Sequence, residues 1–558
     1  MWRKRMLFTL VALCALIAVW PALGAEGAAD QLKQAERLCT KKQFAEAEQV
    51  YLGALERVAD AEQRFAIVRK LAGVFVAQDK LAQAKTTVEQ ILSDYAQHAR
   101  LPHAIHEIAE SCNKLGKAKE IKDIYAQILQ EQPGRSDAIW LIMGQAIADT
   151  LAGDDDAAWE SMEKLLNEYN DDSRAVDAVS QVALSHEKIK DYINARQLYR
   201  HILEVLANNE QAIYAQIGVV RASIVLRDPN SAKAAVDDLL SNYSGNKDYV
   251  KVVSDVAETY RRAGKFEDSR KLHEYIVDYY KDDEQGIWSQ QYIVFCSIVL
   301  MDEDGIDAGI EKLFSDFSSR KEITEVAYEI GHRLRCRYVE KAKTMFEYVL
   351  SKDSSGRLGA LARVGLGGTQ LREGDDKGAR AVFDSIIEEY QDQAILPEVV
   401  YLIANTYWNQ ACTRRDPEAR FLTNKIDPEY EYYVFETLGE CERIINGLPG
   451  NDFYTAEANL LAGRCRRELG QFAHAIERYE TITENWPEHG GSAYSQYAVM
   501  RCVEKLMRSK TLTKNDALTL LRYAFQKVTS YYPDSMPANA ANTLLDRWER
   551  HNAEGRKQ

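Results

Sequence analysis

The sequence lacks the short signatures of the common catalytic sites. It contains no HExxH, no GxSxG and no Walker-type phosphate loop, so metalloprotease, α/β-hydrolase and P-loop chemistry have no motif to start from. The run from Gly365 to Gly368 is glycine-rich, but it lies inside a helical pattern, whereas a phosphate loop follows a strand. We therefore predict that the protein is not an enzyme, with no catalytic residue and no cofactor.

Cysteine pairs with metal-binding spacing are also absent. No CxxC occurs among the nine cysteines, which argues against a structural zinc site. His103 and His106 stand three residues apart near Cys112, yet no ligand set completes them, so we interpret them as solvated side chains and predict no metal. Cys112 and Cys441 fall in helical packing stripes and are predicted to be buried.

The other cysteines leave one question open. Four of the nine fall between residues 412 and 502, namely Cys412, Cys441, Cys465 and Cys502. Their spacing is compatible with free thiols and also with one disulfide, because pairing cannot be deduced from sequence alone.

The chain has no excess of basic residues. It carries 70 Lys and Arg against 85 Asp and Glu, a net charge of −15. Nucleic acid and anionic membrane surfaces bind proteins through Lys and Arg, so neither is the expected main partner. The acidity would weakly steer a basic partner, or it serves only to keep an extended surface soluble.

Only one long apolar run occurs, at the N-terminus. Met6–Trp20 follows Arg3-Lys4-Arg5 and precedes Pro21–Ala25, the pattern of a secretory signal peptide over residues 1–24. The run is shorter than the roughly 20 residues of a membrane-spanning helix. We predict cleavage and export to the periplasm or cell envelope, with no membrane insertion afterwards; an uncleaved anchor is the alternative. Cleavage would change the net charge from −15 to −18.

An internal repeat of 37 residues organises most of the chain. Ala47, Tyr51, Leu55 and Val58 form one stripe along a predicted helix, and similar stripes begin at each of six further steps of 37 residues. Twelve residues before each stripe a small residue recurs, as at Ala35, which lets a preceding helix approach closely. Glycine or polar residues separate the two helices.

The repeat continues less regularly towards the C-terminus. Residues 31–392 are predicted to hold ten helix pairs and residues 393–550 three degenerate ones, about 13 in all. An insertion near residues 413–433 interrupts the second range, and a final helical piece is expected to cap the open end.

This pattern resembles the tetratricopeptide repeat family, whose unit is a helix–turn–helix with small, aromatic and proline positions. The match is best at Leu461-Ala462-Gly463, Ala475, Tyr479 and Pro487, although the period is longer than usual and the early Trp is scarce. The resemblance implies an all-α, right-handed α–α superhelix whose first helices line a concave, protein-binding surface.

On that surface the resemblance places the candidate partner-binding residues, which combine aromatic, Asn and Arg side chains typical of peptide grooves. They are Tyr401, Asn405, Trp408, Arg464 and Arg467. Arg414 and Arg415 of the insertion are added, because loops that depart from a repeat often carry binding. A tolerated insertion without function is the alternative interpretation.

We therefore expect a non-enzymatic scaffold that binds a peptide or protein partner. The alternatives are an outer-membrane or secretion assembly factor, and a non-catalytic subunit of a peptidoglycan-processing complex. The partner itself is not encoded in any recognisable motif.

Overall fold

The computed structural model describes residues 31–32, 34–36, 38–39, 42–132, 134–414, 426–448, 452–532 and 535–554. All regular structure among these residues is helical. The all-α class expected from the sequence is thereby confirmed. The predicted signal peptide, residues 1–24, lies outside the described residues.

The helices group into two compact units that divide between Gln285 and Gly286. Each hairpin consists of a first helix and a second helix in chain order. In the first unit the partly described helical residues 31–39 belong to the first helix of the first hairpin, and α2 is its second helix. The helices of this unit are α2 Phe44–Arg57, α3 Ala61–Ala77, α4 Leu81–Asp94, α5 Leu101–Lys114, α6 Ala118–Glu131, α7 Ala138–Ala152, α8 Asp155–Glu168, α9 Ala175–Lys188, α10 Tyr192–Val205, the 3-10 turn η1 Glu210–Tyr214, α11 Ala215–Val225, α12 Pro229–Asn242, α13 Tyr249–Arg262 and α14 Phe266–Tyr280.

The second unit continues the same alternation and ends in one additional helix. Its helices are α15 Glu284–Leu300, α16 Glu303–Phe317, α17 Ile323–Leu334, α18 Val339–Lys352, α19 Arg357–Glu373, α20 Asp376–Glu389, α21 Leu396–Arg414, α23 Pro428–Gly447, α24 Asp452–Glu468, α25 Phe472–Asn485, α26 Ser492–Arg508, α27 Lys514–Tyr531 and α28 Met536–Glu554. The sequence did not mark the division at Gln285, and the predicted ranges 31–392 and 393–550 stay predictions.

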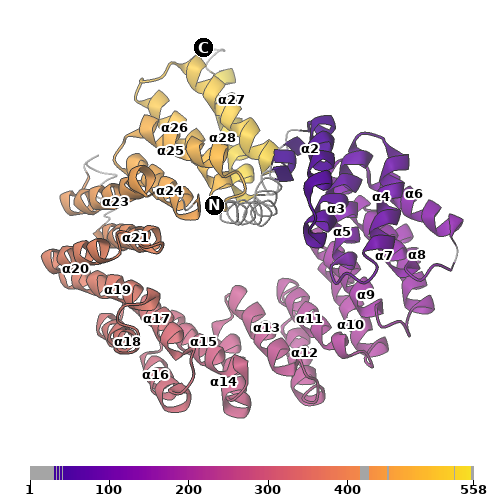
Figure 1. The fold of residues 1–558 in the computed structure, drawn as a ribbon, viewed down its shortest axis with the longest axis horizontal. Helices are drawn as coiled ribbons and strands as arrows, with labels where there is room; N and C mark the ends of the chain where they lie inside the picture. Colours follow the sequence, from indigo (N-terminus) through magenta and orange to yellow (C-terminus); the bar gives the residue numbers. More distant parts are fainter. Residues whose placement is uncertain are drawn as a thin grey trace, which may run out of the picture. The chain divides into compact units, whose positions relative to one another are not determined.

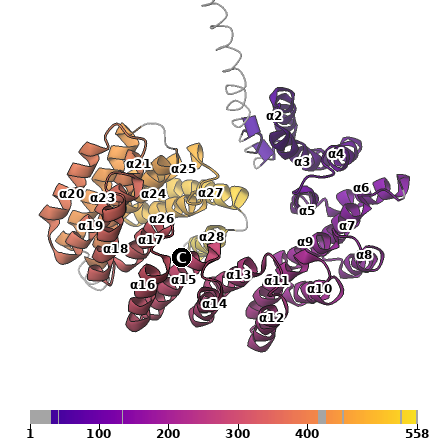
Figure 2. The same ribbon diagram turned by 60° about the horizontal axis from the view of Figure 1, so that its bottom comes forward.

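Consecutive helices pair as antiparallel hairpins, and the hairpins stack in chain order within each unit. In the first unit α9, α11 and α13 follow one another in one row and α10, α12 and α14 in a second row (Figures 1 and 2). In the second unit the first helices α17, α19, α21 and α24 adjoin in the same way. With the helical residues among 31–39 as the first member, the described helices make 13 pairs. The predicted tetratricopeptide-like arrangement of helix hairpins is confirmed.

The turn inside each of the first eight hairpins has one residue in the left-handed backbone conformation, and it recurs at steps of 37 residues. Glycine fills three of these positions, as at Gly153 with φ of 77°. Other residue types fill the remaining five of the eight regularly spaced turns. The positions are Lys42, Asp79, Gly116, Gly153, Lys190, Arg227, Gly264 and Met301. The turn geometry is therefore imposed by the repeat, because most non-glycine side chains adopt it only at a cost.

The buried stripe of the second helices differs from the sequence prediction at one position. In α6 the fully buried residue is Ile128, at 0% exposure, whereas the predicted Leu129 is only partly buried. Ala54, Leu165 and Ile202 show the same shift by one residue, whereas in α4 both Ile91 and the predicted Leu92 are buried. Seven residues bring a helix back to within about 20° of its starting direction, whereas eight leave it about 80° away. The residue at i+7 therefore belongs to the stripe, and the leucine after it flanks the core in α2, α6, α8 and α10.

The small residue twelve positions before each stripe lies where it was expected, in the contact between helices. Its accessible surface is zero in all seven regular copies. They are Ala35, Ala72, Ala109, Ala146, Ala183, Val220 and Ala257. Glycines bring the helices still closer: a Cβ at Gly218 would lie 2.4 Å from the ring of Tyr199, and one at Gly365 2.4 Å from that of Phe346. Large second-helix rings therefore pack directly on first-helix backbone.

One first helix is enclosed on nearly all sides. Twelve of the 15 residues of α7 are buried, in keeping with a sequence that is apolar around its whole circumference. Its neighbours α5 and α9 meet each other beyond it. There Lys188 Nζ donates to His106 Nε2 at 2.9 Å and pairs with Glu110. His106 was predicted to be solvated, but it is 2% exposed and belongs to this contact.

A substitution at the i+7 position is expected to cost more than its neighbour. Ile128→Asp places a carboxylate in the core and removes a buried aliphatic side chain, so we expect a loss of about 3 kcal/mol or more in the free energy of unfolding. Leu129→Asp, one residue further, is expected to cost about 1 kcal/mol because its side chain keeps access to water. Urea unfolding followed by circular dichroism compares the two. Equal losses would contradict the corrected stripe.

Acidification is expected to loosen the contact between α5 and α9. Burial, followed by the charge of Lys188, lowers the pKa of His106 to about 4 from its ordinary value of 6.5. The unfolded chain therefore takes up this proton first, and the stability provided by neutral His106 is complete above pH 6.5 and is lost as the pH falls towards 4. We expect the loss to approach about 3 kcal/mol below pH 4, where His106 of the folded chain is protonated as well.

The measurement is the urea midpoint at pH 7 and pH 4.5 for the natural chain and for His106→Gln, with the exposed His474→Gln as control. The His106→Gln variant should lose less stability on acidification than the other two chains. Parallel losses in all three chains would show that His106 does not contribute.

Candidate partner-binding site

Three of the predicted site residues lie on one face of α21. Tyr401, Asn405 and Trp408 stand at i, i+4 and i+7, a spacing that aligns side chains along a helix. All three are half-buried. Their side chains therefore remain accessible on the first-helix row of the second unit.

Tyr401 connects this face to the next first helix, α24. Its hydroxyl donates to Glu457 Oε2 at 2.6 Å, and its ring centroid lies 5.7 Å from that of Tyr454. Burial, together with the Glu457 acceptor, raises the pKa of Tyr401 above its ordinary range. The phenol is therefore neutral at physiological pH and serves as a donor to the carboxylate.

Further side chains extend this contact towards the start of α26. Glu457 Oε1 lies 3.1 Å from His489 Nε2, and the ring of Phe453 packs 5.1 Å from Tyr454 and 6.0 Å from His489. Phe453 is 57% exposed, which makes it the most accessible aromatic ring of this cluster. The result is an aromatic surface with one carboxylate within it.

Trp408 and Arg464 lie further along the same two helices. Both α21 and α24 are first helices of consecutive hairpins, so they run in the same direction, and Tyr401 meets Glu457 near their starts. Each helix rises about 1.5 Å per residue. Trp408 and Arg464 each stand seven residues further along their helix than Tyr401 and Glu457, on the same row of first helices.

Arg464 and Arg467 hold a tyrosine of the following hairpin between them. The Arg464 guanidinium lies 5.2 Å from the Tyr494 ring centroid, and Arg467 Nη1 donates to Tyr494 Oη at 2.9 Å. Arg467 also pairs with Glu468 at 3.4 Å. Both arginines thus serve the packing of α24 on α26, and the side chain of Arg464 stays partly exposed.

Arg414 does not join this group. It ends α21, and six residues of helix turn it about 120° away from Trp408. Its guanidinium is 44% exposed and forms an ion pair with Glu429 of α23 at 3.4 Å. Arg415 and most of the predicted insertion, residues 415–425, lie outside the described residues.

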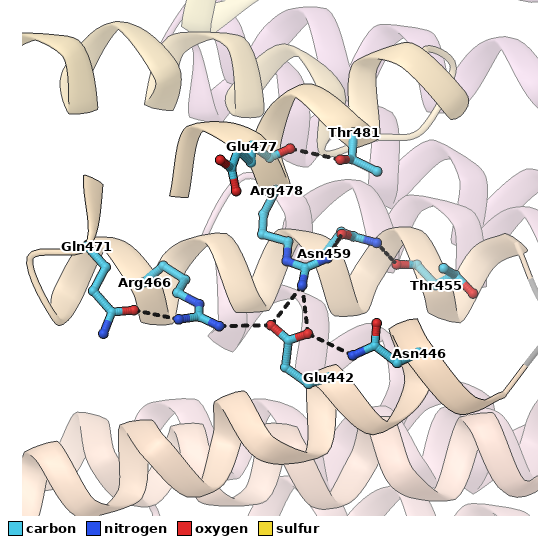
Figure 3. A network of polar contacts seen from close by, with 9 residues as sticks. All are labelled: Glu442, Asn446, Thr455, Asn459, Arg466, Gln471, Glu477, Arg478 and Thr481. Atoms are coloured by element: carbon cyan, nitrogen blue, oxygen red, sulfur yellow. Dashed lines mark hydrogen bonds and ion pairs between the residues drawn. The ribbon is translucent and has the colours of Figure 1, made fainter. Parts of the chain in front are cut away.

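Beside the aromatic cluster, a half-buried polar network joins α23, α24 and α25 (Figure 3). Glu442 accepts from Arg466 Nη2 at 3.1 Å, from Arg478 Nη2 at 2.6 Å and from Asn446 at 3.1 Å. Burial alone would raise the pKa of Glu442, but the two guanidinium groups outweigh it and hold this pKa below its ordinary value. The network keeps the hairpin of α24 in register with its neighbours.

Sequence analysis missed Tyr454, Glu457, His489 and Tyr494. They lie outside the repeat offsets from which the candidates were taken, and each meets its partner only across a helix boundary. The one available signal was composition, since residues 453–457 combine two aromatic residues and a carboxylate.

The remaining expectations concern cysteines, metals and membranes. Cys112 and Cys441 are buried as predicted, and all eight cysteines of the described chain are free thiols. Among the described residues no group of three or more His, Cys, Asp or Glu side chains is placed to hold a metal. A search of the same residues finds no helix with the length and apolar character of a membrane span.

Comparisons with known proteins give only distant structural neighbours. No protein-family model and no curated protein matches the sequence. Among solved structures, yeast Tom70 is 12% identical over 95% of this chain and 97% of its own, with a TM-score of 0.34. The structure of Naa15/Naa10 bound to HypK-THB gives 14% identity over 96% and 90%, with a TM-score of 0.34. The APC/C hetero-tetramer Cut9-Hcn1 gives 13% over 90% and 98%, with a TM-score of 0.20. At these TM-scores the assignment of the fold rests on the helix pairs themselves.

Removal of the Glu442 charge is expected to destabilise the second unit. Glu442→Gln leaves two guanidinium groups without their carboxylate, and we expect a loss of about 2 kcal/mol in the free energy of unfolding. The matched control is Glu477→Gln on α25. The carboxylate of Glu477 is exposed, and the hydrogen bond that Glu477 accepts from Thr481 is to its backbone oxygen. Urea midpoints of the two variants measure the difference. If Glu477→Gln lost as much stability as Glu442→Gln, the network would not be the source of the stability lost in the Glu442 variant.

Proposed function

We propose that the protein is a protein-interaction scaffold that holds a peptide or protein partner on the first-helix row at α21 and α24. The observation that supports this most directly is the aromatic surface of Tyr401, Tyr454 and Phe453 where α21 meets α24, with Trp408 and Arg464 further along the same two helices. Aromatic and arginine side chains supply most of the binding energy in protein interfaces. Extended peptides also offer backbone groups and carboxylates that Asn405 and Arg464 are able to bind.

The proposed location rests on the N-terminal sequence. A basic start, a 15-residue apolar run and small residues at its end indicate export. We propose that the scaffold works in the periplasm or cell envelope, on a protein partner rather than on nucleic acid. The net charge of −15 supports this choice.

The test is capture of a partner from envelope extract by the chain that begins at Ala25, compared with a Trp408→Ala/Arg464→Ala variant. We expect the variant to retain at least ten-fold less partner, because two central aromatic and arginine anchors are removed. Quantitative mass spectrometry of the bound proteins measures the ratio, and circular dichroism checks that both chains fold.

A matched control removes the same residue types elsewhere. Trp159→Ala/Arg57→Ala changes a 42% exposed tryptophan on α8 and an exposed arginine on α2, both second helices. It should retain the partner fully. Equal retention by the Trp408/Arg464 variant would refute the site, and the absence of any captured protein would refute the scaffold function.

A further inference from the structure

A cavity of about 690 Å³ lies at the C-terminal end of the second unit, away from the site at α21 and α24. It is formed by the end of α26, the connection to α27, the start of α27 and the capping helix α28. Its apolar lining comes from Met507, Leu512 and Trp548. This volume is in the range of pockets that enclose small ligands.

The charge of the lining is the reverse of that of the chain. Four lining residues are basic, and Glu504 is the single acidic one, in a protein with a net charge of −15. They are Arg508, Lys510, Lys514 and Arg547. The cavity therefore combines an apolar interior with a cationic rim.

The carboxylate of Glu504 does not neutralise the positive charge that the rim presents to a ligand. It is 3% exposed and already faces three guanidinium groups: Arg508 at 2.7 Å, Arg501 at 3.6 Å and Arg547 at 4.0 Å. In contrast, Lys510 and Lys514 are exposed and make no ion pair with any residue that the structure describes. Two ammonium groups thus remain available at the entrance.

The connection that carries these lysines is held in place by its own hydrogen bonds. Thr511 N and Leu512 N both donate to Leu506 O, at 2.9 and 3.2 Å. Thr513 caps α27 by accepting from Asp516 N at 3.2 Å. Since the backbone of the rim is held before any ligand arrives, the entropy lost on binding is mainly that of the two lysine side chains.

From this geometry we infer that the cavity is a binding site for an anionic amphiphile, a small molecule with an apolar chain or ring and a carboxylate or phosphate group. The apolar part occupies the space beside Met507, Leu512 and Trp548, and the anionic group meets Lys510 and Lys514. Long polyanions are disfavoured because the chain as a whole is acidic. The site is independent of the partner surface at α21 and α24.

The test is isothermal titration of the full chain with sodium dodecanoate and, separately, dodecyl phosphate, both below the concentration at which they form micelles. We expect saturable binding at one site per chain. Dodecanol and dodecylamine have the same chain without the anion and should bind at least ten-fold more weakly. A second arm offers phosphatidylglycerol vesicles, which distinguishes a free amphiphile from a membrane lipid.

Lys510→Glu/Lys514→Glu reverses the rim charge at two exposed positions and should weaken dodecanoate binding at least ten-fold. Lys321→Glu/Lys377→Glu makes the same change at two exposed lysines of the same unit outside the cavity and should leave binding unchanged. Trp548→Ala should also weaken binding. If this substitution unfolds α28, the Lys510→Glu/Lys514→Glu variant still tests the inference. The Trp408→Ala/Arg464→Ala chain should bind dodecanoate normally, so this result is separate from the outcome of partner capture.

Three results would overturn the inference. The first is the absence of saturable binding of either anion up to about 1 mM, a very weak affinity. The second is equal binding by the Lys510/Lys514 variant and its control. The third is binding to vesicles, or to a blocked acidic peptide with a phenylalanine, in the absence of binding to free dodecanoate.

Discussion

The close approach of two helices within and between hairpins is the constraint on which this structure depends. First-helix positions such as Ala109 and Gly218 have no room for a larger side chain, because rings such as Tyr199 lie where a Cβ would extend. Dispersion contacts of this kind are individually small and act only in large numbers and at short distance. A hairpin alone cannot bury its rings, so each one is stable only through its neighbours, and stability is shared along each unit. The rings are also the reason that the first helices form a row within each unit, on which side chains of successive hairpins come close together.

The sequence predicted the repeat because close packing restricts residue types at few, evenly spaced positions. Ala35 and its counterparts were found from spacing alone, and the hairpins follow from them. The left-handed turns were only partly predictable. Gly153 indicates its own conformation, whereas Lys190 and Met301 adopt the same one without any local preference for it. Each such residue costs about 1 kcal/mol in isolation. The packing of the hairpins on both sides supplies that energy, so the turn is a property of the stack and leaves no mark at the residue itself.

The candidate site also shows what sequence spacing can predict and what it cannot. Tyr401 and Trp408 were found because they occupy repeat offsets of one helix, and periodicity describes a single helix well. Tyr494 and His489 were missed because their contacts depend on how far one hairpin is displaced along the next, which sequence spacing does not determine. Arg467 shows the consequence: it is predicted to bind a partner, and the structure adds a hydrogen bond from it to Tyr494 Oη that spacing could not indicate. Residues on the repeat face can therefore be assigned to packing or to binding only when the position of the neighbouring hairpin is known.

The surface at α21 and α24 differs from the surface at α27 and α28 in what packs next to it. At α21 and α24 another hairpin follows, so side chains that are not engaged in packing share one continuous row with the next first helix. At α27 no further hairpin follows in the described chain, and α28 closes the core in its place. A single helix covers less apolar surface than a pair, which leaves the space beside Met507 and Trp548 open. The chain places Lys510 and Lys514 at that opening, where hydrated ammonium groups keep the exposed apolar surface soluble. An open row suits the extended partner that we propose and a capped end suits the compact ligand that we infer, so the repeat architecture offers a separate place for each.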